Sequence, residues 1–153
     1  MFISNRITVC CLIGLLAAGC GNSSLIKARG RIIKQGQTYV PPEGEGLRIF
    51  FAPLDSPNRT HYDSYAAVYD PDAGTFQVMG KDGAGLPRGK YRIDLQLMKQ
   101  KEDLLGGALL GKRSPFTCEV TGNRDDIVVD LDRANFDNLL ARATQPKKVR
   151  RRN

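Results

Sequence analysis

Alternating hydrophobic and polar positions recur along the middle of the chain, and a period of two residues is typical of strands that have one buried face. The clearest example runs over 90–98, where Tyr91, Ile93, Leu95 and Leu97 share one side of the predicted strand. Six further strands are predicted at 26–32, 47–52, 65–69, 75–79, 116–120 and 127–131. Glycine, proline and other turn residues separate them. The pattern therefore predicts an all-β fold, a seven-stranded antiparallel β-sandwich that occupies residues 25–132.

The turn at 70–74 predicts a hairpin between two of these strands. Proline fixes φ in the turn, the aspartates can bond back to the backbone, and Gly74 accepts a positive φ. Asp70, Asp72 and Gly74 also share the spacing at the start of a calcium loop, but the glutamate that such loops need at their far end is missing. The pattern favours a structural turn.

The second half of the domain contains a longer connection and a change of period. The leucine-rich segment 100–114 is expected to cover one end of the core, with a helical turn. After residue 132 the apolar spacing becomes helical through Phe136, Leu139, Leu140 and Ala143, with Asn135 as the candidate N-cap. We therefore expect a short helix and a disordered basic tail over 133–153.

The N-terminal segment has the pattern of a removable export signal. A single charge, Arg6, precedes an apolar run of 12 residues at 7–18, whereas a helix needs about 20 to span a bilayer. Small residues then lead into Cys20, which predicts a helical signal peptide at 1–19 and a short tether at 20–24. A cysteine in this place resembles the lipobox of bacterial lipoproteins, although Ala17 stands where leucine is commonest. The resemblance implies that the thiol of Cys20 is diacylated and that Cys20 becomes the new N-terminus. The alternatives are an ordinary signal peptide cut near Gly19 and a short buried helix.

The formal net charge of +7 belongs to the chain ends. Arg6 lies in the signal, and six cations lie at the C-terminus, so residues 20–141 sum to zero (7 − 1 − 6 = 0). These six are Arg142, Lys147, Lys148, Arg150, Arg151 and Arg152. This distribution gives no specific nucleic-acid site. The stretch 147–152 is a candidate for binding an anionic surface, with a solvated, non-specific tail as the alternative.

The remaining chemistry-bearing residues predict no catalytic or metal site. Cys10 and Cys11 lie in the signal, so Cys118 is left without an internal disulfide partner and is expected in the interior beside Phe116 and Val120. A lone histidine and a lone cysteine do not make a metal site, and we expect no cofactor.

Three further candidates have structural alternatives. His61, Asp63 and Ser64 are explained by loop polarity rather than by catalysis. Lys27 lies on the polar face of its strand, which argues against an internal amide cross-link. Four aromatic residues could bind a glycan or peptide, or could simply pack within the sandwich; they are Phe50, Tyr62, Tyr65 and Tyr69.

Several segments between residues 26 and 132 resemble the carboxypeptidase regulatory-like domains, which are transthyretin-like sandwiches. The segments are 30–32, 35–37, 47–53, 66–70 with 74–76, and 85–93. The last is similar to the family's glycine–proline–glycine turn that leads into an aromatic strand. Tyr69 departs from the usual threonine, and the leucine–glycine segment 103–111 replaces a common proline–tyrosine segment. The resemblance rests on turn and core residues and implies a fold without a chemistry.

Such domains occur in small lipoproteins of planctomycete-type bacteria. The resemblance and the leader together lead us to expect a non-enzymatic lipoprotein, exported and anchored to a bacterial membrane through Cys20. Its sandwich would act as an interaction or display module for an unidentified envelope protein or glycan. The alternatives are an accessory domain of an envelope enzyme complex and a secreted soluble binder of carbohydrate or peptide.

Overall fold

The computed structural model describes residues 25–55, 64–122 and 124–143. Seven strands of four or more residues match the seven that the sequence predicts: β1 (Ala28–Lys34), β3 (Glu45–Pro53), β4 (Tyr65–Asp70), β5 (Thr75–Val78), β6 (Gly89–Lys99), β8 (Thr117–Val120) and β9 (Arg124–Asp130). Two strands of two residues each, β2 (Gln37–Thr38) and β7 (Glu102–Asp103), extend the sheet. The fold is therefore all-β, as predicted.

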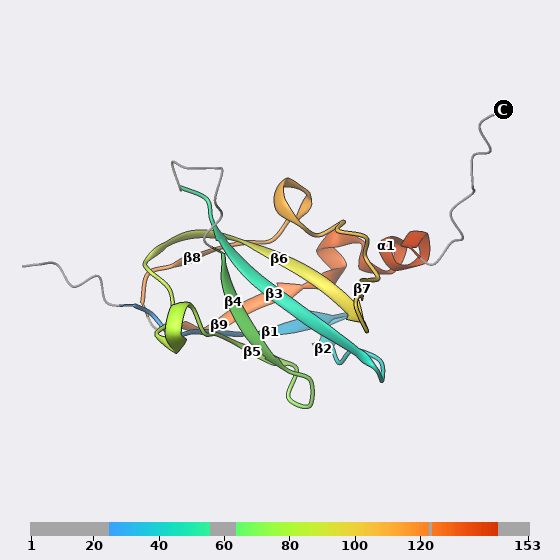
Figure 1. Cartoon of the computed structure of the whole chain (residues 1–153), viewed down its shortest axis with the longest axis horizontal. Helices are drawn as coiled ribbons and strands as arrows, with labels where there is room; N and C mark the ends of the chain where they lie inside the picture. The colour runs from blue at the N-terminus through green and yellow to red at the C-terminus, as the bar shows by residue number, and fades with distance from the viewer. Residues whose placement is uncertain (1–24, 56–63, 123, 144–153) are drawn as a thin grey trace, which may run out of the picture.

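The strands hydrogen-bond in the order β2-β1-β5-β4-β3-β6-β7, with β8 added to β6 and β9 added to β1. This sheet folds over on itself, so that β3 and β6 lie across the core from β1 and β9 (Figure 1). All pairs are antiparallel except β1 with β9, which is parallel. The prediction of a purely antiparallel sandwich is wrong at this pair. After β8, which pairs with β6, the chain crosses to the opposite layer and does not return as a hairpin.

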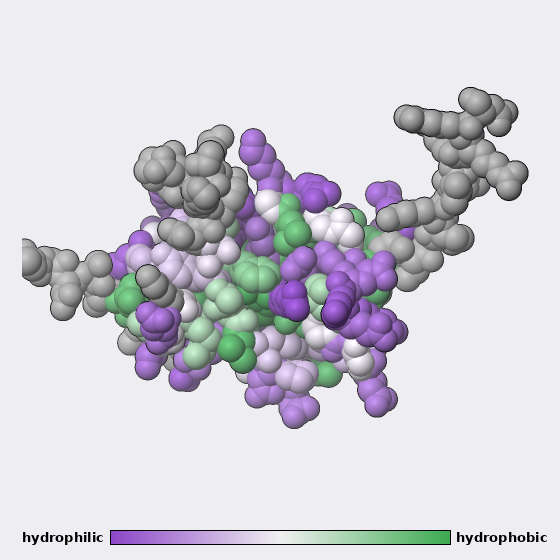
Figure 2. Space-filling model, viewed as in Figure 1, coloured by the Kyte–Doolittle hydropathy of each residue, from purple (hydrophilic) through white to green (hydrophobic). Residues whose placement is uncertain are grey.

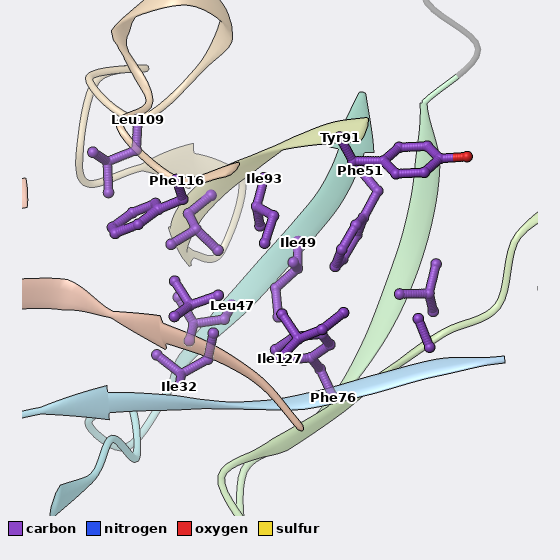
Figure 3. Close-up of a cluster of buried hydrophobic side chains, with 14 of the residues drawn as sticks. Ile32, Leu47, Ile49, Phe51, Phe76, Tyr91, Ile93, Leu109, Phe116 and Ile127 are labelled. Carbon is purple, nitrogen blue, oxygen red and sulfur yellow. The ribbon is translucent and has the colours of Figure 1, made fainter. Parts of the chain in front are cut away.

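Strict alternation gives the folded sheet an inner and an outer face. In β6 the residues Tyr91, Ile93, Leu95 and Leu97 are buried, and the four residues that alternate with them are partly exposed, as the sequence predicts. Polar side chains cover much of the outer face, and a hydrophobic area lies over β4 and beside β3 (Figure 2). Side chains from both layers meet between them and form one core (Figure 3).

The leucine-rich segment 100–114 covers one end of the core, as expected. Leu105 and Leu109 are buried, and the backbone N–H of Leu95 donates to the carbonyl of Leu109 at 3.0 Å. The Asp103 side chain accepts from the N–H groups of Leu105 (3.1 Å) and Gly107 (2.8 Å). A 3₁₀ turn, η2 (Gly111–Arg113), ends the segment and supplies the expected helical turn.

Two short helical elements follow β9. The 3₁₀ turn η3 (Leu131–Ala134) leads into α1 (Phe136–Ala143), and Phe136 is buried against the ring of Tyr39 with the centroids 5.5 Å apart. Asn135 precedes the helix as predicted, but its φ of 49° is left-handed, whereas an N-cap residue is usually extended. It ends η3, and its carbonyl accepts from Leu139 in the first turn of α1 at 3.1 Å. None of the helices within the described residues is long and apolar enough to cross a membrane.

Candidate functional site: a groove on the outer face

An open groove of about 890 Å³ crosses the outer face of four neighbouring strands, β9, β1, β5 and β4. We call it the outer-face groove. Its lining comprises Arg29, Gly30, Arg31, Val68, Asp70, Thr75, Phe76, Gln77, Met79 and Val128. A volume near 900 Å³ lies within the range of sites that bind small molecules.

A close backbone approach and a register shift lie at the base of this surface. Gly30 lies opposite Phe76 on one side and Ile127 on the other, and a Cβ atom at this position would lie 2.1 Å from the Ile127 carbonyl oxygen. Just before it, the pairing of β1 with β9 shifts register between Ala28 and Gly30. Such irregularities bend a strand and increase its twist. The glycine and the register shift lie where β1 pairs with both β5 and β9, at the base of the groove.

The register places the polar groups of the groove in two rows across the strands. In the first row, Arg31 lies opposite Val128 of β9 and opposite Thr75 of β5, which in turn lies opposite Asp70 of β4. In the second row, Arg29 lies opposite Gln77, and Gln77 lies opposite Val68. From β1 to β4, each row therefore runs from an arginine to a different chemical group, the carboxylate of Asp70 in the first row and the apolar side chain of Val68 in the second.

The two arginines are exposed, and among the described residues neither guanidinium forms a hydrogen bond or an ion pair. They lie two positions apart on one strand, so their Cα atoms are separated by about 6.6 Å. A guanidinium carries its charge at every physiological pH and presents five N–H donors. The β1 side of the groove is therefore a pair of permanent cations whose donors are not used by the side chains that the structure describes.

Asp70 supplies the opposite charge at the β4 side. One of its carboxylate oxygens, Oδ1, accepts from the backbone N–H groups of Asp72 (3.0 Å) and Ala73 (3.2 Å). These bonds form the hairpin turn that the sequence predicts, and the calcium-loop alternative gains no support, since the described residues contain no cluster of three or more metal-ligating side chains. The turn fixes the carboxylate at the end of the first row.

Exposed hydrophobic side chains border these charges. Val68 is 60% exposed, Val128 43% and Met79 36%, although all three occupy outward positions that are usually polar. In Figure 2 the hydrophobic area over β4 marks one part of this surface. Apolar surface beside unpaired cations is the combination that recognises a ligand with a charged end and an apolar body.

Of the two alternatives for the aromatic residues, packing within the sandwich holds for Tyr65 and Tyr69. Tyr65 and Tyr69 pack against the core, whereas Phe50 alternates to the outer face. The Tyr69 hydroxyl donates to the carbonyl of Tyr39, and the ring of Tyr65 meets that of Tyr91 edge-on with centroids 6.0 Å apart. Burial raises the pKa of Tyr39, Tyr69 and Tyr91 to about 12. Packing therefore explains these tyrosines, and Tyr62 lies outside the described residues.

The remaining candidate residues lie partly within and partly outside the part of the chain that the structure describes. Lys27 is exposed, as predicted, and Ser64 is exposed. Cys118 is half-buried against the core, beside buried Phe116 and Val120. His61, Asp63 and the lipidation candidate Cys20 lie outside the described residues, as does the basic stretch 147–152.

The groove could not be recognised from the sequence, because Arg29 and Arg31 have the pattern of the ordinary polar face of a strand. The available signal was the valine at two outward positions, 68 and 128.

Comparisons with known proteins assign no family. No protein-family model and no curated protein matches the chain. One solved structure that is similar is the crystal structure of a DUF3823 family protein from Parabacteroides merdae, with 19% sequence identity and a TM-score of 0.38. The match covers 69% of this chain and 44% of the other, so the chain spans less than half the length of that structure. A likeness at this level carries no argument about function.

Proposed function

We propose that the protein is a membrane-anchored lipoprotein whose β-sandwich is a non-enzymatic binding module, with the outer-face groove as its binding surface. The observation that carries the proposal is the pair of exposed arginines beside exposed valines in a groove of about 890 Å³. The lining offers charges, hydrogen-bonding groups and apolar contacts, which are the means of recognition.

The anchor would hold this groove near the membrane surface. Arg29 follows Cys20 by nine residues, and an extended chain spans at most about 3.6 Å per residue, so the groove lies within roughly 32 Å of the lipid attachment. Two acyl chains on Cys20 make stable anchoring possible, because one chain alone binds a bilayer only marginally. A short tether therefore fits a module that binds molecules close to the bilayer.

The test is a ligand screen that assumes no particular chemistry. The exported Cys20→Ala protein would be labelled with ¹⁵N and mixed with fragments that include organic acids, amines, sugars and short peptides. The proposal expects some fragments to shift the backbone amides of β1, β4 and β5. The matched control is the outer face of β3 and β6, whose amides are expected to keep their positions. Shifts confined to that control face, or no shifts with any fragment, would contradict the groove as the binding surface.

A further inference from the structure

We infer that the outer-face groove binds a short peptide with two free termini, its carboxylate at Arg29 and Arg31 and its ammonium at Asp70. The inference rests on the proposed function and names its ligand. It follows from the distribution of charge across the groove, the spacing of the strands and the position of the exposed apolar side chains.

The anion end of the ligand is set by the arginine pair. Neither guanidinium has a hydrogen-bonding partner among the described residues, so none of those residues occupies either fork. A planar carboxylate matches the guanidinium fork in a bidentate arrangement. Two arginines that lie two positions apart on β1 can hold one carboxylate between them, or one carboxylate and a backbone carbonyl.

The cation end is set by Asp70. Its Oδ1 is used by two backbone N–H groups of the turn, and among the described residues no hydrogen bond reaches its Oδ2. The carboxylate is exposed and lies in the groove lining, at the opposite end of the row that begins with Arg31. An ammonium group completes this pattern, whereas a second anion would be repelled there.

The spacing of the strands sets the length scale of the peptide. Strand β5 lies between β1 and β4, so the backbones of Arg31 and Asp70 are two strand spacings apart, about 9.5 Å. An extended peptide rises about 3.3 Å per residue, so a tripeptide separates its two charged termini by a comparable distance. Between them, the hydroxyl of Thr75 and the amide of Gln77 can pair with peptide groups, because both lie on β5 in the lining.

The exposed hydrophobic side chains favour an apolar central residue. Val68 ends the second row on β4 and Met79 directly follows β5, so an apolar ligand side chain over this part of the lining would cover their exposed surface. A flat anionic bilayer fits the surface less well, because it cannot enter a groove and because Asp70 faces the same side as the arginines. The observations therefore favour a peptide over a membrane surface as the occupant.

Calorimetry with three tripeptides tests each end separately. The probes are Ala-Val-Ala with two free termini, its N-acetylated form and its C-terminal amide, each titrated into the detergent-solubilised full chain. We expect the free tripeptide to bind with a Kd on the order of 0.1 mM, the range for a ligand of this size. Each blocked form is expected to bind about tenfold or more weakly, since a charge-assisted pair is lost.

Three variants connect these losses to residues. The double variant Arg29→Gln and Arg31→Gln is expected to lose the preference for the free carboxylate. Asp70→Asn keeps an acceptor for the turn and is expected to lose the preference for the free amine. The matched control is Arg48→Gln, which removes an exposed arginine of β3 outside the groove lining and is expected to leave the Kd unchanged. Unchanged melting temperatures verify the folding of each variant.

The results that would contradict the peptide inference differ from those that would contradict the proposed function. The peptide assignment would be overturned if Arg48→Gln weakened tripeptide binding as much as the variants in the groove, or if the preference for the free amine survived Asp70→Asn. The assignment would also fall if phosphatidylglycerol vesicles bound through Arg29 and Arg31 and the tripeptide did not compete. If fragments of other chemistry shift the groove amides while no tripeptide binds, the peptide inference falls and the binding-module proposal stands.

Discussion

Leu95 provides the sharpest test of the fold, because alternation in β6 places it in the core and its neighbour Gln96 on the outer face. Leu95 is fully buried, at 0% exposure, and lies opposite Ile49 of β3. Its backbone N–H donates to Leu109 of the segment that covers the core. Replacing it by alanine therefore removes side-chain carbon from the centre of the packed layers and leaves both backbone partners in place.

The expected magnitude follows from burial. Leu95→Ala deletes three carbon groups, and each is worth about 0.8 kcal/mol of transfer free energy, so about 2.4 kcal/mol is lost before any cavity forms. The sheet on either side restrains collapse, which adds a cavity term. We expect the free energy of unfolding to fall by about 2–5 kcal/mol in total. That is a large fraction of the stability of a domain of this size.

Urea unfolding monitored by circular dichroism measures this loss. The control is Gln96→Ala on the same strand, one position along, where the side chain is partly exposed and the expected change is within about 0.5 kcal/mol. Both variants are expected to keep the wild-type m-value. A small and equal effect at the two positions would refute the assignment of β6 faces.

Three further predictions concern packing, ionisation and the tail. Gly30→Ala is expected to destabilise the fold by about 1–3 kcal/mol or more in the same urea assay, because its Cβ would collide with the Ile127 carbonyl and the Phe76 ring. The control is Gly46→Ala, whose Cβ would have no atom within 4 Å, and equal destabilisation by the two variants would contradict the close approach at Gly30. Burial raises the pKa of Tyr39, Tyr69 and Tyr91 from 10.0 to about 12, so the neutral phenols favour the folded state. The stability that these phenols contribute is then fully present below pH 10 and is lost as the pH rises toward 12. An absorbance titration at 295 nm measures their ionisation, and the contrary result would be that all the tyrosines ionise near pH 10 in the folded protein. Truncation after Pro146 leaves α1 intact, so little change in the melting temperature is expected. It is expected to abolish the salt-sensitive binding of the lipid-free chain to anionic vesicles, whereas salt-insensitive binding that persists after truncation would exclude the tail as its source.

The seven strands could be predicted because each carries its own local evidence. Alternation in β6 separates buried from exposed positions residue by residue, and the 70–74 turn contains the residues that its backbone requires. The parallel pairing of β1 with β9 could not be predicted in this way. The alternation of Ile127, Val128 and Val129 is the same whichever direction the strand runs. Only the packing of the two layers decides the direction.

The candidate site depended on the same non-local information. Arg31, Thr75 and Asp70 lie in one row only because β1 pairs with β5 and β5 pairs with β4 in a particular register. In the sequence, Arg31 and Asp70 are 39 positions apart (70 − 31 = 39), with no motif to connect them. The choice between the two alternatives for the aromatic residues depended on non-local information too. Phe50 and Tyr65 lie on opposite faces, and their separate strands did not reveal that relation.

The central claim, a membrane-anchored binding module, is tested most directly by the chemical state of Cys20. Mass spectrometry of the protein from cells fed a labelled fatty acid is expected to find a mature chain that begins at Cys20 and carries the label, in the membrane fraction. Cys20→Ala is expected to abolish both the label and the membrane association. A mature chain that begins elsewhere, or a Cys20→Ala protein that remains labelled and membrane-bound, would contradict the lipoprotein account.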